Sequence, residues 1–204
     1  MKAKAIQTRH NGYFFRSRLE ARWAIFFESL SIEYEYEPEG FELPSGRYLP
    51  DFYLPKIRDG LWVEIKNAQF GKGENISAKL TELAERTAKG VTLLCGEPML
   101  MVNRAHGDWG SHPEVEMFFG AEGWDNNYAF CECPWCGKIG FEFDGRGARV
   151  CGWEKHHANE EEALAAIKHL GHHRADDKCY TGASPKLVAA AIKARAARFE
   201  FGGR

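Results

Sequence analysis

Apolar residues first become periodic just after Ser17. They recur at the three- and four-residue spacing of one helix face: Leu19, Trp23, Phe26, Phe27 and Leu30. Serine is a preferred N-cap residue, because its hydroxyl accepts a hydrogen bond from a free backbone N–H of the first turn. The pattern predicts a helix that begins after Ser17 and buries one face.

Two later segments alternate between apolar and polar residues with the period of a β-strand. In "IEYEYE", residues 32–37, the alternation predicts a half-buried strand. From Leu61 to Lys66 it predicts an amphipathic strand that carries Glu64 and Lys66 on one face. The intervening "GFELPSGRYLPDFYLP" predicts short extended pieces around a turn at residues 44–46.

A helix and a buried strand are predicted next. Residues 76–89 predict a helix that Gly90 stops, and the apolar run from Val91 to Cys95 predicts a buried strand. A helix between two strands is the usual crossover of a parallel pair. The order helix, strands, helix, strand therefore predicts an α/β fold with a mixed β-sheet flanked by helices.

The pattern changes near residue 128, where a second, smaller unit is predicted. "KIGFEFDGRGARVCGW" is typical of a β-hairpin that turns at residues 144–145. A short helix capped by Asn159 and a last, basic helix from residue 184 follow. We expect a core at 1–127, a metal-binding module at 128–182 and a C-terminal helix at 183–204.

Charge is uneven along the chain. The net charge of the 204 residues is only −2, but residues 1–30 carry six Lys/Arg against two Glu, and residues 184–204 carry five against one. The two ends are therefore the candidate basic surfaces. "MKAKAIQTRHNG" lacks the apolar core of a secretory signal, and the apolar runs are too short to cross a bilayer. We expect a cytoplasmic protein without a membrane partner.

Two carboxylates and a lysine fall in a spacing that suggests metal chemistry. Asp51 and Glu64 offer the hard oxygen ligands that Mg²⁺ prefers. Lys66 shares a strand face with Glu64, about 7 Å along it by strand rise. Phosphodiester cleavage by a metal ion uses such oxygens together with a cation near the attacking water and the phosphate. The alternative for Glu64 and Lys66 is a solvated strand face.

Pro50-Asp51 followed by Glu64-Ile65-Lys66 resembles the signature of the PD-(D/E)XK nuclease superfamily, which has the restriction-endonuclease-like fold. The resemblance covers roughly residues 10–100, and the predicted order of elements fits it. Members of the superfamily often add a glutamate from the first core helix. Glu20 in "RSRLEARWA" matches that position.

Glu20 also has a purely structural interpretation. It stands three residues after Ser17, which is the spacing of a capping box. On a helical wheel, however, Glu20 lies beside Phe27 at the edge of the apolar stripe, so it is expected to face the sheet. We favour a place in the site.

The resemblance implies a role for each of these residues. Asp51 and Glu64 would bind one or two Mg²⁺ (or Mn²⁺) ions, together with the main-chain carbonyl of Ile65. Lys66 would orient or help to deprotonate the attacking water and stabilise the charged transition state. Glu20 would complete the metal site directly or through water.

Basic residues around these acids and in the second unit are candidates for phosphate binding, with solubilising surface charge as the alternative. His10 is a further candidate near the core, and Gln69 is a weaker one. Lys138, Lys193, Arg195 and Arg198 are further candidates toward the end of the chain. The predicted nucleic-acid contacts are Arg16, Arg18, Arg22, Arg146 and Arg149.

Cysteines cluster in "CECPWCGKIGFEFDGRGARVCGWEKHH". Cys133 and Cys136 have C-x-x-C spacing, and Cys151 follows after the predicted hairpin, an arrangement that resembles a zinc ribbon. Without a secretory signal a disulfide is disfavoured, and a catalytic dithiol fits the hairpin context poorly. The segment is too small to hold itself together by its core, so we expect structural Zn²⁺.

The fourth zinc ligand is the open position. A ribbon would offer a second cysteine near Trp153, and this chain has none there. His156 is the predicted ligand. The alternatives are His157, His172, His173, Cys179 and Cys131.

Together these features predict a Mg²⁺-dependent endonuclease that hydrolyses phosphodiester bonds of duplex or structured DNA. The resemblance points to a bacterial or phage-infected cell, and small nucleases that cut both strands often act as homodimers. One alternative is a DNA-binding or assembly protein that keeps the nuclease fold without cleaving. Another is a nuclease for RNA or branched DNA junctions.

Overall fold

The computed structural model describes residues 6–67, 77–98, 115–119, 123–124, 128–143, 145–170 and 184–199, and it shows a mixed α/β protein. These residues form two compact units. The first takes the described residues up to 98, those from 115 to 124 and those from 189 onward, and the second takes those from 128 to 188. The region boundaries expected at 127/128 and 182/183 stay predictions.

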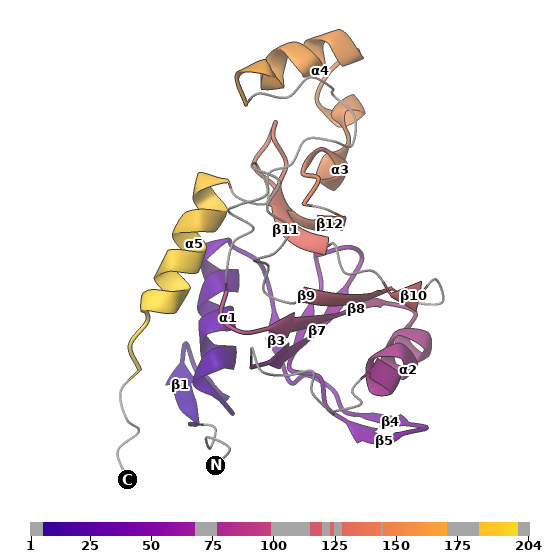
Figure 1. The fold of residues 1–204 in the computed structure, drawn as a ribbon, viewed down its shortest axis with the longest axis vertical. Helices are drawn as coiled ribbons and strands as arrows, with labels where there is room; N and C mark the ends of the chain where they lie inside the picture. The colour runs from indigo at the N-terminus through magenta and orange to yellow at the C-terminus, as the bar shows by residue number, and fades with distance from the viewer. Residues whose placement is uncertain are drawn as a thin grey trace. The chain divides into compact units, whose positions relative to one another are not determined.

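A mixed six-stranded sheet organises the first unit, in the order β10-β9-β8-β7-β6-β3 (Figure 1). β7 and β8 pair in parallel, as the crossover pattern predicted, and the other neighbours pair antiparallel. The strands are β3 (Glu35–Tyr36), β6 (Phe52–Leu54), β7 (Leu61–Lys66), β8 (Gly90–Cys95), β9 (Val115–Phe119) and β10 (Gly123–Trp124).

Helices α1 (Arg18–Ser29) and α2 (Ser77–Thr87) cover opposite faces of this sheet. From α1, Phe27 packs edge-on against Phe52 of β6, with ring centroids 5.4 Å apart. The next residue of β6, Tyr53, points to the other face, where it packs on the cluster that contains Trp62 and the α2 residue Leu83. Successive side chains of one strand therefore anchor the two helices.

The predicted start of α1 is confirmed. Ser17 has an extended backbone, and its Oγ accepts a hydrogen bond from the backbone N–H of Glu20 at 3.1 Å. The apolar stripe of the helix is also confirmed, since Trp23, Phe26 and Phe27 are buried. The cap fixes where the helix begins and therefore where Glu20 lies.

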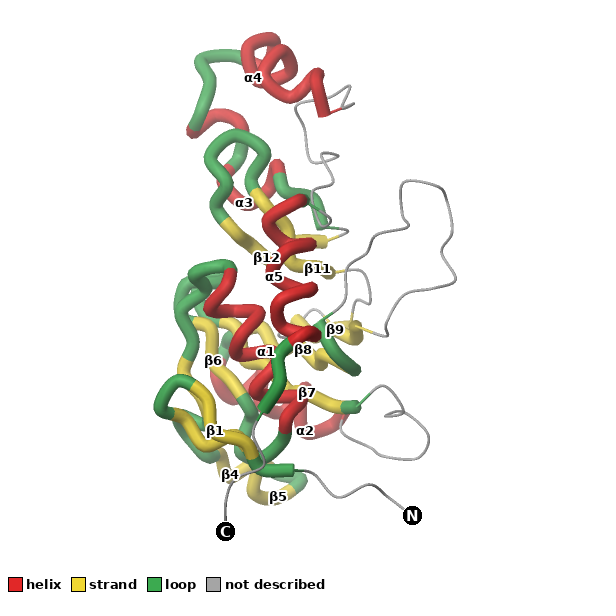
Figure 2. Tube along the Cα trace, turned by 90° about the vertical axis from the view of Figure 1, so that its left-hand side faces the viewer, coloured by secondary structure: helices red, strands yellow, loops and turns green. Residues whose placement is uncertain are grey.

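Two hairpins complete the first unit. β1 (Thr8–His10) pairs with β2 (Tyr13–Phe15) ahead of α1, and β4 (Phe41–Leu43) pairs with β5 (Gly46–Tyr48). The turn predicted at residues 44–46 is confirmed. The β4–β5 hairpin lies against α2 (Figure 2), and through Phe41 and Tyr48 it extends the apolar cluster of that face.

The second unit is built on one two-stranded sheet. β11 (Tyr128–Glu132) pairs antiparallel with β12 (Ile139–Phe143). Short helical pieces follow, and the Asn159 cap predicted for α4 is confirmed, because the Asn159 Oδ1 accepts from the Glu162 N–H at 3.0 Å. The remaining elements are α3 (Ala148–Cys151), the 3₁₀ turns η2 (Trp153–Lys155) and η3 (Lys168–Leu170), α4 (Glu160–Ile167) and α5 (Pro185–Ala196). The boundary between the two units falls within α5, between residues 188 and 189.

The prediction of a hairpin that turns at residues 144–145 is wrong. β12 pairs with the preceding strand β11, around the cysteine knuckle, and residues 148–151 form the helical turn α3. Gly140 explains the packing, because a Cβ there would lie 2.6 Å from Val150 Cγ2. The missing side chain lets α3 lie directly on β12. Asp144 lies outside the described residues.

Three further expectations need correction. Residues 32–36 alternate in burial as predicted, but Glu37 is partly buried and breaks the alternation. Only β3 (Glu35–Tyr36) is a strand, because β6 offers it two partners and Glu37 turns away with φ +46°. Gly90 does not stop α2. The chain leaves the helix at Ala88, with φ +53°, and Gly90 begins β8 against Leu61, whose Cδ1 would lie 3.1 Å from an added Cβ.

The third correction concerns β7. Its residues from Leu61 to Ile65 are all buried, so the solvated-face interpretation of Glu64 is wrong. A strand with neighbours on both sides and helices on both faces has no solvated face. Glu64 is therefore a buried carboxylate, only 4% exposed.

Gly60 fixes the entry into β7 and gives a test of the packing. Its φ is +108°, and an added Cβ would lie 2.2 Å from the Tyr53 hydroxyl oxygen. Gly46 has nearly the same φ, +111°, but open space around it, so it is a matched control for backbone strain alone. We expect Gly60→Ala to lower the free energy of unfolding by about 1–3 kcal/mol more than Gly46→Ala in urea titrations. Equal losses in the two variants would contradict this packing.

Candidate functional site

The β6–β7 pairing brings the predicted acidic residues together. Phe52 pairs with Val63, and continuing that register by one residue places Asp51 opposite Glu64. The Asp51 Oδ2 accepts the backbone N–H of Ile65 at 2.7 Å. Asp51 is 2% exposed, so both carboxylates are almost completely removed from bulk water.

Glu20 reaches the same region from the first turn of α1. Its Oε1 accepts from the Ser17 hydroxyl at 2.6 Å, and its Oε2 accepts from the Arg16 backbone N–H at 3.1 Å. The Tyr36 hydroxyl donates to the same Oε2 at 2.6 Å. The predicted capping box therefore forms only in part: Ser17 caps the Glu20 N–H, but the Glu20 carboxylate accepts from the Arg16 N–H and the Ser17 hydroxyl rather than from the Ser17 N–H. The carboxylate is also buried within electrostatic range of Asp51. Both roles of this residue are compatible.

The electrostatics of the cluster are dominated by buried negative charge. Burial raises the pKa of Asp51 well above its ordinary value, and the nearby carboxylates of Glu64 and Glu20 raise it further. The Ile65 N–H and the Lys66 ammonium act in the opposite direction. The three acids thus repel one another in a place where water cannot screen them.

Two cations offset part of this charge. The Arg16 guanidinium lies 2.5 Å from Asp51 Oδ1 and also pairs with Glu37, and Lys66 pairs with Glu64 Oε1. Burial alone would lower the pKa of Arg16, but the Asp51 carboxylate raises it, so the guanidinium stays charged. When all three acids are ionised, the two cations leave one negative charge unbalanced.

Two tyrosines of the cluster were not predicted from the sequence. The Tyr48 hydroxyl donates to Glu64 Oε2 at 2.6 Å, as Tyr36 does to Glu20. Burial raises the pKa of both hydroxyls, and the partner carboxylates raise it further, so both remain donors at neutral pH. The alternating pattern placed Tyr36 on the apolar face of its segment, and Tyr48 stands three residues before Asp51. Neither pattern identifies the carboxylate to which the hydroxyl donates.

The donor set of this acidic cluster fits a hard divalent cation. Carboxylate oxygens are the ligands that Mg²⁺ takes in proteins, and a cation would relieve the repulsion that raises the pKa of Asp51. Asp51 and Glu64 could hold such an ion. Among the described residues, the carboxylate oxygens of Asp51, Glu64 and Glu20 do not lie close enough together to form one group of metal ligands. Their oxygens take part in hydrogen bonds and ion pairs instead.

The predicted phosphate-binding residues take different positions. Arg16 lies at Asp51, Arg22 pairs with Glu97 as Arg195 does, and His10 pairs with Glu28. Arg18 is half-buried in the first turn of α1. In the second unit the Arg146 guanidinium lies 5.0 Å from the Phe143 ring centroid, and Arg149 is exposed. The Arg16 guanidinium is thus in direct contact with the acidic cluster. Gln69 lies outside the described residues.

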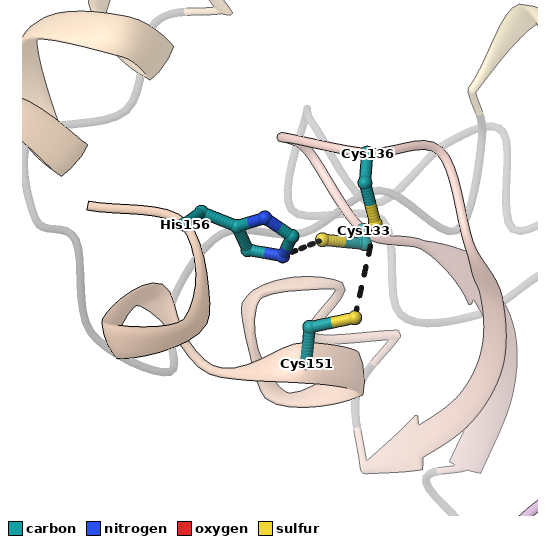
Figure 3. A group of neighbouring side chains, drawn as sticks. All are labelled: Cys133, Cys136, Cys151 and His156. Carbon is teal, nitrogen blue, oxygen red and sulfur yellow. Dashed lines mark hydrogen bonds between the residues drawn. The ribbon is translucent and has the colours of Figure 1, made fainter.

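The second unit contains a cluster of three cysteines and one histidine. Cys133 follows the strand β11, Cys136 lies in the knuckle, Cys151 ends α3, and His156 follows η2. Their side chains point toward one another, with all four ligand atoms within 4.8 Å (Figure 3). This Cys₃His cluster could hold a metal such as zinc.

Two ligand–ligand distances in the Cys₃His cluster are close to the edges of a tetrahedral zinc site. Cys133 Sγ lies 3.5 Å from His156 Nε2, and Cys136 Sγ lies 3.8 Å from Cys151 Sγ. A tetrahedron with zinc bonds of ~2.0–2.3 Å has edges of roughly 3.3–3.8 Å. A disulfide is excluded for these cysteines, because its sulfurs would be ~2.05 Å apart. The backbone bond from Cys133 N–H to the Lys138 carbonyl, 2.8 Å, closes the knuckle around the site.

The geometry separates the two adjacent histidines. The ring of His156 enters the Cys₃His cluster, whereas His157 packs edge-on against Trp135 with ring centroids 5.6 Å apart. Cys131 is buried in β11 and does not belong to the cluster. Three further candidates for the fourth ligand lie outside the described residues: His172, His173 and Cys179.

No family model, no curated protein and no solved structure matches this chain. Among the described helices, none is both long enough and apolar enough to cross a bilayer. The acidic cluster and the Cys₃His cluster are therefore the two features that indicate a function.

The neighbouring histidines provide a matched test of the metal centre. We expect His156→Ala to weaken zinc affinity at least about 10-fold, because it removes one of four ligands, and His157→Ala to leave it nearly unchanged. The measurement is zinc release to a chromogenic chelator, with metal content determined by mass spectrometry. If His157→Ala released zinc as readily as His156→Ala, the assignment of the fourth ligand would be wrong.

Proposed function

We propose that this protein is a Mg²⁺-dependent deoxyribonuclease of the PD-(D/E)XK type with a restriction-endonuclease-like core. The single observation that supports it is the convergence of Asp51, Glu64 and Glu20 in one buried cluster, with Lys66 at Glu64. An acidic cluster without function would be disfavoured, because burying charges that repel one another destabilises a fold. A bound divalent cation would relieve the repulsion between these charges, and this relief would contribute to its binding affinity.

In this proposal each residue of the cluster acts on the ion, the water or the phosphate. Bound Mg²⁺ would polarise the scissile phosphate and supply a more acidic water. Asp51 and Glu64 hold the ion. Lys66 orients the attacking water and stabilises the negative charge that grows on the phosphate during in-line displacement. Glu20 holds the geometry at the start of α1 and offers a further oxygen.

The tyrosines and Arg16 position these groups. The Tyr48 and Tyr36 hydroxyls each occupy one oxygen of a carboxylate, so the remaining oxygens are directed in a fixed way. Arg16 is half exposed, whereas the Asp51 side chain beside it is 3% exposed. Arg16 therefore stands between the acids and the solvent, where the phosphate of a substrate would arrive.

We assign the Cys₃His cluster a structural zinc ion that holds the second, zinc-ribbon-like unit together. Its described core is small, with Ala148 and Ile167 packed on Trp135. Four protein ligands close the coordination sphere, which is the pattern of structural zinc and leaves no open position for a substrate. Arg146 and Arg149 on this unit would contact DNA phosphates without reading sequence.

Removing either metal-binding acid should abolish cleavage without unfolding the protein. We expect Glu64→Gln and Asp51→Asn to lower the nicking rate of supercoiled plasmid at least about 10²-fold with Mg²⁺ or Mn²⁺. Glu85→Gln, at an exposed position of α2, is the control and should retain the full rate. Equal nicking by all the variants would contradict the site. No nicking by the unaltered protein on plasmid or branched DNA would favour a DNA-binding protein that does not cleave.

Arg16 should compete with the divalent cation for Asp51. We expect Arg16→Gln to tighten Ca²⁺ binding roughly 3- to 10-fold at pH 8, because it removes a positive charge beside the ion. It should also lower the nicking rate, because the phosphate loses a contact. Arg47→Gln is the control, since Arg47 pairs with Glu42 at the surface. Calorimetric titration measures the affinity, and unchanged Ca²⁺ binding in Arg16→Gln would contradict the competition.

The affinity for the divalent cation should also depend on pH in a defined direction. The pKa of Asp51 is raised in the folded protein, so its neutral form is favoured at pH values where an exposed aspartate is already ionised. Protons therefore compete with the cation, and we expect the thermal stabilisation by Ca²⁺ to grow as pH rises from 5 to 8. The same titration of Asp51→Asn should lose this dependence. A pH-independent stabilisation in the unaltered protein would contradict the raised pKa.

A further inference from the structure

The β1–β2 hairpin places an arginine and a phenylalanine side by side on its outer face. Asn11 and Gly12 form the turn with φ values of +46° and +82°, the left-handed pair of a tight two-residue hairpin. Arg9 pairs with Phe14 across the hairpin, and the Arg9 guanidinium lies 5.7 Å from the Phe14 ring centroid. The neighbouring pair, Thr8 and Phe15, points inward and is buried.

The hairpin is held firmly to α1. Glu28 accepts a hydrogen bond from Asn11 Nδ2 at 3.1 Å and pairs with His10 Nε2 at 2.8 Å. Tyr13 packs on Tyr34, with ring centroids 5.6 Å apart. Phe14 is therefore displayed on a fixed support and does not need to be ordered when a ligand binds.

Phe14 is the most exposed aromatic side chain that the structure describes, at 52%. Residues 9–14 line an open hollow of about 550 Å³, which is within the size range of small-ligand sites. An exposed ring with a guanidinium over it offers a stacking surface and a positive charge together. A nucleobase with its phosphate is the ligand that uses both.

The position of the hairpin connects it to the acidic cluster. Phe14 lies in β2 and Arg16 is the first residue after this strand, so the length of the chain alone keeps their Cα atoms within about 7 Å of each other. The guanidinium of Arg16 contacts Asp51. A base next to a phosphate bound at the acids would therefore come within reach of the Phe14 ring.

We propose that Arg9 and Phe14, the hairpin platform, stack an unpaired nucleobase beside the scissile phosphate. This deepens the proposed nuclease function, on which it rests, by naming the substrate class as DNA with at least one unpaired base at the cleavage position. Bases inside a duplex are stacked on their neighbours and become available to an aromatic ring only when they are splayed or flipped out. Single strands, frayed ends and branch points offer such bases without that cost.

The test is a binding measurement that does not depend on cleavage. Fluorescence anisotropy would follow a 15-nucleotide oligothymidine and a 15-base-pair duplex binding to the zinc-loaded full chain in the Glu64→Gln background, without Mg²⁺. We expect Phe14→Ala to weaken binding of the single strand about 5- to 50-fold and binding of the duplex less than about 2-fold. Phe14→Trp should restore the affinity for the single strand.

Ile6→Ala is the matched control, because Ile6 is another exposed apolar side chain close by, 44% exposed. The platform is overturned if Phe14→Ala behaves like Ile6→Ala, if it weakens single strand and duplex equally, or if the parent protein binds no single strand. Failure of the nuclease proposal is distinguishable. In that case the unaltered protein would not nick any DNA with Mg²⁺, while the effect of Phe14→Ala on binding would remain.

Discussion

The first unit depends on one electrostatic constraint: three carboxylates are buried near one another, and protein cations neutralise them only in part. Asp51, Glu64 and Glu20 come from a loop, a strand and a helix, so the cap of α1 and the β6–β7 register must form together to place them. Arg16 and Lys66 make this tolerable in the folded chain. In the proposed function, the same imbalance would give the site its affinity for a divalent cation.

In the second unit the main constraint is the small size of the apolar core. Its two-stranded sheet and short helices bury little apolar surface, and a two-stranded sheet alone is marginally stable in water. The Cys₃His cluster gathers ligands from the knuckle, from α3 and from the residue after η2. Metal binding at such a site is coupled to folding, so a bound ion would supply stability that a larger core would otherwise provide.

The features of the fold that depend on local sequence or on the two-residue period of a strand could be predicted. The Ser17 cap and the parallel β7–β8 pair follow from spacing and order. The meeting of Asp51 with Glu64 was implied by the resemblance to the nuclease signature. The contacts of the Tyr36 and Tyr48 hydroxyls with the acids could not be predicted, because they form only after β3 and the β4–β5 hairpin have packed in place. The pairing of β11 with β12 was missed because turn residues at 144–145 resembled a hairpin more closely than the cysteine knuckle did.

The most direct test of the central claim is the location of a Mn²⁺ ion by anomalous scattering in crystals of the protein. We predict a peak between Asp51 and Glu64, about 2.1 Å from an oxygen of each carboxylate, with the Arg16 guanidinium moved off Asp51. A map at saturating Mn²⁺ with no peak at these carboxylates, and with Arg16 still on Asp51, would contradict the assignment of this cluster as a metal site.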